Sequence, residues 1–248
     1  MKSFYTIRVM NEIKKLLIKR KFKTKLLNFI KYIKRLFLDK GIIKIFYKNR
    51  ISFYDTWKKQ IVNDLKQKQN WRNDREEIFG SFDYLTIQKI FSLLSKSNNT
   101  ILEIGSYDGF FIEYYQDFKK IILSDITEYS NLYPNNPNFD FVLLNGHNLS
   151  NIKKNSVDVV FSIDTFVRLD KMIIKTYILD LIRIVKPGGY MILHIPNIFH
   201  GYSMLLEYTK VSKYFYRNLL SNSCDEIIFN DELHQKSSFL ICKRNEIN

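Results

Sequence analysis

The sequence predicts an α/β fold in which a mostly parallel β-sheet is covered by helices on both faces. After residue 99, short apolar runs alternate with segments of helical periodicity, which is the pattern of βαβ units. The first of these runs leads into a glycine-containing turn and then a helix, as at the end of a parallel strand. With 248 residues, 46% of them hydrophobic, the chain can bury one sizeable core.

The expected strands are short runs rich in β-branched and aromatic residues, bounded by turn residues. They are Thr100 to Ile104, Lys120 to Asp125, Phe139 to Asn145, Val157 to Ser162, Tyr190 to Ile195, Glu226 to Asn230 and Ser238 to Cys242. The expected helices have apolar residues at three- and four-residue steps. They are Phe53 to Gln69, Tyr84 to Leu94, Phe110 to Phe118, Lys171 to Val185 and Tyr202 to Leu220.

Positive charge is concentrated at the start of the chain. Residues 1–50 hold sixteen Lys and Arg against two acids, which accounts for the whole net charge of +14. From Leu26 to Phe37, apolar residues recur at helical spacing with basic residues between them, so we expect a basic amphipathic helix. We therefore divide the chain into a basic helical extension (1–50), a helical lead-in packed on the main domain (51–99) and the main domain (100–244).

A basic amphipathic helix has three possible partners: its own domain, an anionic membrane surface, or a nucleic acid such as RNA, which we favour less. No apolar stretch approaches the roughly 18 residues that span a bilayer. The lysine-rich start, with Ser3 as its one serine, also differs from the Arg- and Ser-rich composition of mitochondrial presequences. We expect a cytoplasmic protein, with a peripheral position at the inner membrane face as an alternative.

The strongest functional signal is the pattern Glu103-x-Gly105-x-x-x-Gly109 between the first strand and the next helix. Glycine lets the strand turn sharply while the backbone approaches a ligand, and the helix N-terminus offers free N–H groups. Asp125 closes the second strand, where its carboxylate could hold a ribose diol. The third strand ends in a polar turn that includes His147 and Asn148 and is suited to a purine edge.

Together with the runs "NSVDVVFSIDTFVRL" and "LIRIVKPGGYMILHIPN", these features resemble the class I S-adenosylmethionine-dependent methyltransferases, over about residues 100–244. The resemblance implies a Rossmann-like seven-stranded sheet with a terminal antiparallel hairpin, and S-adenosylmethionine as the cofactor. It also implies cofactor contacts. Glu103, Gly105, Ser106 and Gly109 would line the methionine and ribose, and Asp125 would hold the ribose hydroxyls. Ile126 would pack on the adenine, with His147 and Asn148 at the adenine edge. Ser162 and Asp164 would face the sulfonium and the acceptor.

The chain departs from the family pattern at two positions. Tyr107 stands where the family's turn usually has a middle glycine, and Arg168 stands where many relatives have histidine after the fourth strand. A catalytically silent scaffold with the same fold is therefore an alternative to an enzyme.

The residues around the fourth strand favour a hydroxyl acceptor. Ser162-Ile163-Asp164-Thr165 differs from the Asn/Asp-Pro-Pro-Tyr/Phe segment that resembles amino-directed DNA methyltransferases. A cytosine-C5 mechanism would need a cysteine beside the cofactor, whereas Cys224 and Cys242 lie in or next to the last two expected strands. A hydroxyl acceptor needs a general base, for which His194, His200 and Asp164 are the candidates, and no metal is required. The segment looks most like enzymes of sugar or bacterial surface polysaccharide modification, so we expect a small-molecule or glycan acceptor, with RNA as the alternative.

Overall fold

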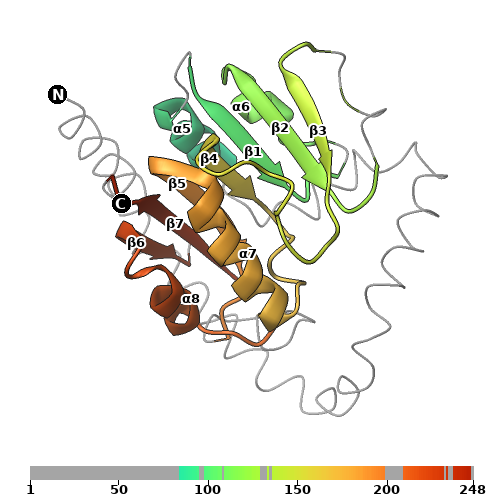
Figure 1. Cartoon of the computed structure of the whole chain (residues 1–248). Coiled ribbons are helices and arrows are strands. Elements are labelled where there is room, and N and C mark those ends of the chain that lie inside the picture. The colour runs from blue at the N-terminus through green and yellow to red at the C-terminus, as the bar shows by residue number, and fades with distance from the viewer. Residues whose placement is uncertain are drawn as a thin grey trace, which may run out of the picture.

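The computed structural model describes residues 84–94, 98–107, 109–128, 133, 136–198, 209–231, 233 and 237–246. Within these ranges the chain forms a seven-stranded sheet of order β3-β2-β1-β4-β5-β7-β6 (Figure 1). The strands are β1 (Thr100–Ile104), β2 (Lys120–Asp125), β3 (Phe139–Leu143), β4 (Val157–Ser162), β5 (Val185–Ile195), β6 (Cys224–Asn230) and β7 (Ser238–Arg244). The helices are α5 (Tyr84–Leu94), α6 (Ile112–Tyr115), α7 (Lys171–Ile184) and α8 (Lys213–Leu220).

Neighbouring strands from β1 to β5 pair in parallel, whereas β7 lies antiparallel between β5 and β6. This arrangement confirms the predicted Rossmann-like fold, including its terminal antiparallel hairpin. Parallel pairing from β1 to β5 brings the carboxyl ends of these strands to one edge of the sheet, as the arrowheads of β1, β2 and β3 show (Figure 1). That edge is where ligands bind in open α/β sheets.

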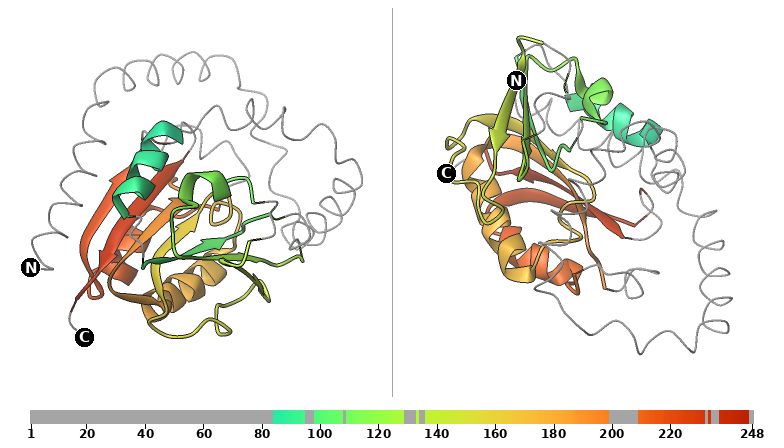
Figure 2. Two further views of the ribbon diagram at one scale, coloured as in Figure 1. Left: turned by 90° about the horizontal axis from the view of Figure 1, so that it is seen from above. Right: turned by 90° about the vertical axis from the view of Figure 1, so that its right-hand side faces the viewer.

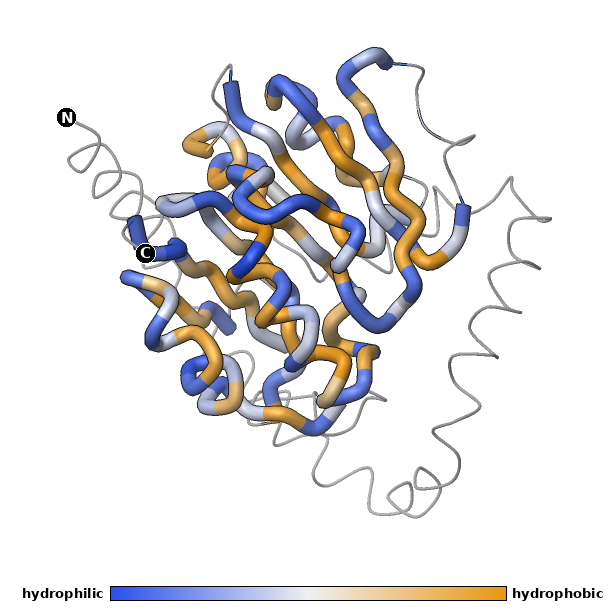
Figure 3. The backbone as a smooth tube through the Cα atoms, viewed as in Figure 1, coloured by the Kyte–Doolittle hydropathy of each residue, from blue (hydrophilic) through white to orange (hydrophobic). Residues whose placement is uncertain are grey.

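Helices cover both faces of the sheet, with α5 and α6 on one face and α7 and α8 on the other (Figure 2). Successive side chains of β1 enter different cores, because strand residues alternate between faces. Ile101 belongs to the core beside α5 and α6, whereas Leu102 and Ile104 belong to the core beside α7 and α8. The strands are accordingly mostly hydrophobic along their length, and the turns between them are hydrophilic (Figure 3).

Two helices show how local sequence builds these layers. Helix α5 buries Ile87, Ile90, Phe91 and Leu94, whose three- and four-residue steps form one apolar face. Helix α7 begins after Asp170, whose carboxylate accepts the N–H of Met172 as an N-cap.

Several predicted boundaries differ from the structure. Strand β5 begins at Val185 and not at Tyr190, so it includes Pro187-Gly188-Gly189. The early start is due to the pairing of Val185 with Val157, ahead of a register shift between Val157 and Val159 of β4. The helix expected over 110–118 is limited to Ile112–Tyr115. There the chain turns back toward β2, and the N–H groups of Lys119 and Lys120 reach the carbonyl of Asn99.

Helix α8 starts at Lys213, later than predicted, because residues 209–212 are not helical and the N–H of Thr209 bonds to the carbonyl of Val167. The basic extension, the helix expected over 53–69 and the rest of the lead-in up to residue 83 lie outside the described residues. The proposed domain boundaries stay a prediction. In the part of the chain that the structure describes, no helix is long and apolar enough to cross a membrane.

Candidate functional site

The predicted cofactor residues cluster at the carboxyl edge of the sheet, where β1 lies between β2 and β4. The turn after β1 is held against β2 by the N–H groups of Gly105 and Ser106, which donate to the carbonyl of Ser124 at 2.8 and 3.0 Å. The strand order reverses at this point, because the chain runs outward from β1 to β3 and resumes with β4 on the other side of β1. Such a reversal leaves a crevice in which nucleotides bind.

Gly105 needs to be a glycine for two physical reasons. Its φ angle is +75°, a left-handed conformation that side chains disfavour. A Cβ atom at this position would lie 1.9 Å from Oγ1 of Thr165, in the turn after β4. The turns after β1 and β4 are therefore in close contact, and a larger residue at either point would separate them.

Tyr107 adopts the left-handed conformation that the family's middle glycine would take, with a φ angle of +46°. In this conformation its backbone N–H donates to Oδ2 of Asp125 at 3.0 Å. The Gly109 N–H closes the turn by donating to the carbonyl of Ser106 at 2.8 Å. The turn thus holds a tyrosine in the left-handed conformation that glycine adopts most readily.

Asp125 ends β2 with its carboxylate at the cofactor edge, and the side chain is 9% exposed. Besides the Tyr107 N–H, the carboxylate accepts the N–H groups of Ile126 and Thr127 at 2.7 and 3.2 Å. Burial raises the pKa of Asp125 to about 6, and the three N–H donors oppose that rise. A carboxylate with these properties fits the ribose hydroxyls of a nucleoside, which would supply further hydrogen bonds to its ionised form.

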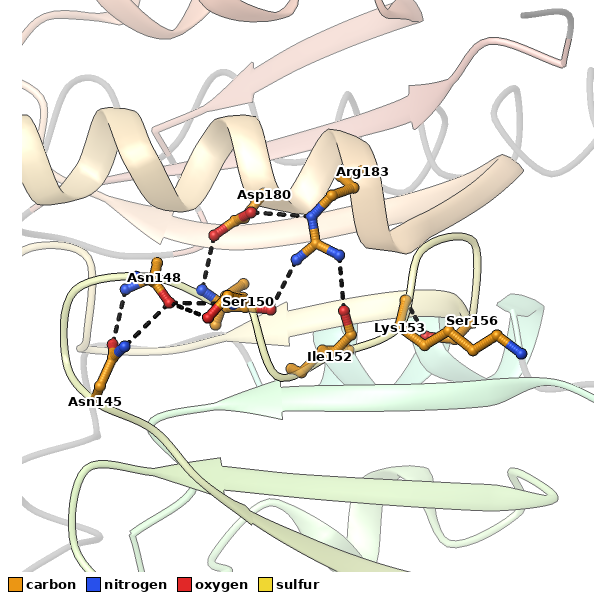
Figure 4. A network of polar contacts seen from close by, with 9 residues as sticks. Asn145, Asn148, Ser150, Ile152, Lys153, Ser156, Asp180 and Arg183 are labelled. Atoms are coloured by element: carbon orange, nitrogen blue, oxygen red, sulfur yellow. Dashed lines mark hydrogen bonds and ion pairs between the residues drawn. The ribbon is translucent and has the colours of Figure 1, made fainter.

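The turn after β3 is organised by Asn145, which the sequence analysis did not single out. Its Oδ1 accepts the backbone N–H groups of His147 and Asn148 at 2.8 and 3.0 Å. The Asn148 amide oxygen is in turn occupied by Asn145 Nδ2 and by Ser150, as Figure 4 shows. His147 is exposed and the Asn148 side chain serves the turn, so their contacts with adenine stay a prediction.

Helix α7 anchors the segment that follows this turn. Asp180 accepts the N–H of Leu149 at 2.7 Å, and Arg183 donates to the carbonyls of Leu149 and Ile152, each at 2.8 Å (Figure 4). Asp180 and Arg183 also pair with each other at 3.1 Å. The proposed adenine side of the site is therefore fixed by a helix more than thirty residues away in sequence.

Two predicted cofactor residues make contacts within the sheet. The Glu103 carboxylate is buried on the α6 face and accepts a hydrogen bond from the hydroxyl of Tyr115. Burial and the nearby Glu103 carboxylate raise the pKa of Tyr115 well above its usual value. The hydroxyl of Ser162 is also buried and donates to the carbonyl of Ile104 at 2.8 Å. Both residues lie next to the cofactor edge, and their direct contact with a cofactor stays a prediction.

The acceptor side contains Asp164 and His194, which are in contact. The backbone N–H of Asp164 donates to Nδ1 of His194 at 3.1 Å, and the other ring nitrogen contacts the hydroxyl of Ser237. Because Nδ1 accepts this hydrogen bond, Nδ1 cannot bind a proton while the bond remains. His194 is fully buried and stacks on Phe239, with ring centroids 5.3 Å apart, which is the environment of a residue that holds its neighbours in position.

Asp164 itself is 29% exposed at its side chain and pairs with Arg168 at 3.0 Å. Of the two candidate bases that the structure describes, Asp164 is the one that is partly exposed to solvent. The third candidate, His200, lies outside the described residues. Within the residues that the structure covers, no group of three His, Cys, Asp or Glu side chains could hold a metal ion.

Residues 102–193 match the sequence family described as a methyltransferase domain. Among solved structures, the chain is similar to a Haloferax volcanii putative methyltransferase complexed with the Trm112 activator. The TM-score is 0.54 with 13% identity, covering 70% of this chain and 94% of that one.

The N-methyltransferase NodS of Bradyrhizobium japonicum, solved with S-adenosylhomocysteine, gives a TM-score of 0.54 with 14% identity, covering 76% and 98% of the two chains. A Pyrococcus horikoshii protein gives 0.52 with 16% identity, covering 72% and 93%. No curated protein matches the chain at a significant level.

The sequence match and the site agree in position. The matched segment begins in β1, ahead of the glycine turn, and ends in β5, so it contains both Gly105 and Asp125. The buried acceptor at Asp125, next to the turn that contains Gly105, fits the ribose of an adenosyl group. Residues 102–193 therefore form a methyltransferase domain, the sheet has the class I fold, and the site fits S-adenosylmethionine as the cofactor.

Proposed function

We propose that this domain methylates a hydroxyl group of a sugar, a glycan or a related small molecule. The observation that carries the proposal is a polar network on the acceptor side of the carboxyl edge. It starts at Asp164, passes through His194 to Ser237, and continues from the adjacent Ser238 to Asp231 at the end of β6.

The carboxylates of Asp164 and Asp231 are partly exposed, and each is held by a basic partner. Asp164 pairs with Arg168, and Asp231, 40% exposed at its side chain, pairs with Lys213 at 2.6 Å. Carboxylate oxygens accept hydrogen bonds from hydroxyl groups, so this lining suits a polyhydroxylated acceptor.

Asp164 is the base in this proposal. S-adenosylmethionine supplies an electrophilic methyl group bound to a positively charged sulfur. The acceptor oxygen bonds to the methyl carbon as the carbon–sulfur bond breaks, and Asp164 takes the hydroxyl proton. His194 then acts by holding the backbone of Asp164, and Arg168 orients its carboxylate.

The two cysteines of the chain give no support to methylation of cytosine bases at C5. A cytosine-C5 mechanism needs a thiolate beside the cofactor, whereas Cys224 and Cys242 are both buried in the β6–β7 hairpin. The hydrogen bond with Cys224, together with burial, raises the pKa of Cys242 well above its usual value, which disfavours a thiolate further.

The test is transfer of labelled methyl groups from S-adenosylmethionine to separated pools of nucleotide sugars, lipid-linked glycans and RNA. We expect alkali-stable label in a sugar pool. Asp164→Asn should abolish transfer while keeping the affinity for S-adenosylhomocysteine, because it preserves the shape of the side chain. Label in RNA alone would contradict the proposal, and no transfer to any pool would favour a catalytically silent scaffold.

We also propose that residues 1–50 hold the protein at an anionic membrane surface. The support is their charge, since each Lys or Arg near such a surface contributes on the order of 1 kcal/mol. The full chain should sediment with vesicles that contain phosphatidylglycerol and stay in solution with phosphatidylcholine vesicles. A gel shift with RNA, together with no vesicle binding, would contradict the membrane proposal.

A further inference from the structure

Tyr133, in the connection between β2 and β3, reaches the glycine turn that follows β1. Its hydroxyl donates to the carbonyl of Tyr107 at 2.7 Å and lies 2.9 Å from Oγ of Ser106. Its ring packs on the same turn, because a Cβ atom on Gly109 would lie 2.9 Å from Cδ1 of Tyr133. The ring also lies near Phe141 of β3, with ring centroids 5.9 Å apart.

With these contacts, both the backbone N–H and the backbone carbonyl of Tyr107 are hydrogen-bonded. Its N–H is held by Asp125 and its carbonyl is held by Tyr133, so the peptide groups on both sides of its Cα atom are held. Fixing both peptide groups restricts the two backbone torsions of the residue. Tyr107 needs such restraint, because its left-handed conformation is unfavourable for any residue with a side chain.

We propose that Tyr133 is a positioning residue for the adenosyl cofactor, holding Tyr107 in the left-handed conformation that a glycine would adopt unaided. The proposal rests on the cofactor site at Gly105 and Asp125 described above. It explains how the turn tolerates a tyrosine at its middle position. It also gives a segment outside the glycine motif a defined role in binding, through the turn and not through contact with the cofactor.

The test is titration of the full chain with S-adenosylhomocysteine for wild type, Tyr133→Phe, Tyr107→Gly and the double variant. Tyr133→Phe deletes one oxygen atom and keeps the ring on Gly109. We expect a three- to tenfold loss of affinity in the wild-type background, about the value of one hydrogen bond. In the Tyr107→Gly background we expect no loss, because glycine needs no help to adopt the conformation.

A second readout is the pH dependence of binding between pH 5 and 7. The Tyr107 N–H lowers the pKa of Asp125, so a turn that releases this bond should move the midpoint of binding to higher pH. Tyr214→Phe is the matched control, because Tyr214 lies on α8 and is 69% exposed. It should leave both the affinity and the midpoint unchanged.

The outcomes separate this proposal from the cofactor site itself. A folded wild-type chain that does not bind S-adenosylhomocysteine would overturn the cofactor site. Tight wild-type binding with equal affinity for Tyr133→Phe would overturn the role of Tyr133 alone. An equal loss in the wild-type and Tyr107→Gly backgrounds would also overturn it, because Tyr133 would then act independently of the conformation at Tyr107.

Discussion

The backbone N–H of Tyr107 donates to Oδ2 of Asp125 across 3.0 Å, and this bond joins the turn after β1 to the end of β2. The two parts of the nucleoside site are thus one unit. Because this bond lowers the pKa of Asp125, the conformation of the turn and the ionisation of the carboxylate are coupled.

Replacing Asp125 should weaken cofactor binding. Asp125→Ala removes the acceptor of the ribose hydroxyls and of three backbone N–H groups, so we expect a loss of about 1 to 3 kcal/mol in the binding free energy of S-adenosylhomocysteine. Asp125→Asn keeps one acceptor oxygen and should lose less. Titration calorimetry measures both, and unchanged affinity in Asp125→Ala would place the ribose elsewhere.

Cofactor affinity should rise with pH from 5 to 7. The pKa of Asp125 is about 6 in the free protein, and ribose hydroxyls donate better to its ionised form than to its neutral form. Binding must therefore release a proton below pH 6, and affinity should fall by up to about tenfold per pH unit there. Asp125→Asn should flatten the profile, and a wild-type profile that is flat between pH 5 and 7 would show that this carboxylate does not contact the ligand.

Asp125 should make the free protein less stable as pH rises. Its pKa is raised from 3.8 to about 6, so the folded state binds the proton more tightly than the unfolded state. The stability contributed by the protonated form is complete below pH 3.8 and is lost as pH rises toward 6, amounting to on the order of 3 kcal/mol. The measurement is the wild-type minus Asp125→Asn difference in unfolding free energy in urea at several pH values. A difference that stays constant with pH would contradict the raised pKa.

Gly105→Ala should destabilise the fold through two separable effects. The left-handed φ angle costs about 1 to 2 kcal/mol for a residue with a Cβ atom. The overlap with Thr165 adds about 1 to 3 kcal/mol. In a Thr165→Ala background the second cost should be smaller, because the Oγ1 atom at 1.9 Å is removed while the Cβ atom at 3.0 Å stays. Urea denaturation measures both costs. Equal costs in both backgrounds would mean that the turns after β1 and β4 do not touch.

Asp158 should stabilise the start of the sheet. Its Oδ2 accepts the N–H of Thr100 at 2.8 Å and the ammonium of Lys186 at 2.7 Å, which links β4 to β1 and β5. Asp158→Ala should therefore cost about 1 to 2 kcal/mol in unfolding free energy. The control is Asp140→Ala, which breaks the exposed pair with Lys120 and should cost under about 0.5 kcal/mol. Equal effects of the two variants would argue against this link.

The fold was predictable because its strands are short hydrophobic runs with sharp boundaries. The run ending at Ile104 and the one ending at Asp125 have the limits that the sequence predicts, since Gly105-Ser106 follows the first and the charged Asp125 closes the second. The positions of Gly105 and Asp125 at one edge follow from parallel pairing alone. The glycine motif then predicts which kind of ligand binds at that edge.

The finer contacts of the site were not predictable, because they join residues far apart in sequence. Tyr133 lies in a connecting segment without a motif, and no local pattern shows that its hydroxyl reaches Tyr107. Arg183 reads as a basic residue near a helix end, yet it holds the carbonyls of Leu149 and Ile152. The same holds for His194, whose hydrogen bonds to Asp164 and Ser237 depend on the pairing of β4, β5 and β7.

The most direct test of the account is calorimetric titration of the full chain with S-adenosylhomocysteine at pH 7. The account predicts one-to-one binding with micromolar affinity, weakened by Gly105→Ala, whose added methyl group would push the turn after β1 away from Thr165. A chain that shows its α/β circular dichroism spectrum and a cooperative unfolding transition, yet takes up neither S-adenosylhomocysteine nor S-adenosylmethionine, would contradict it.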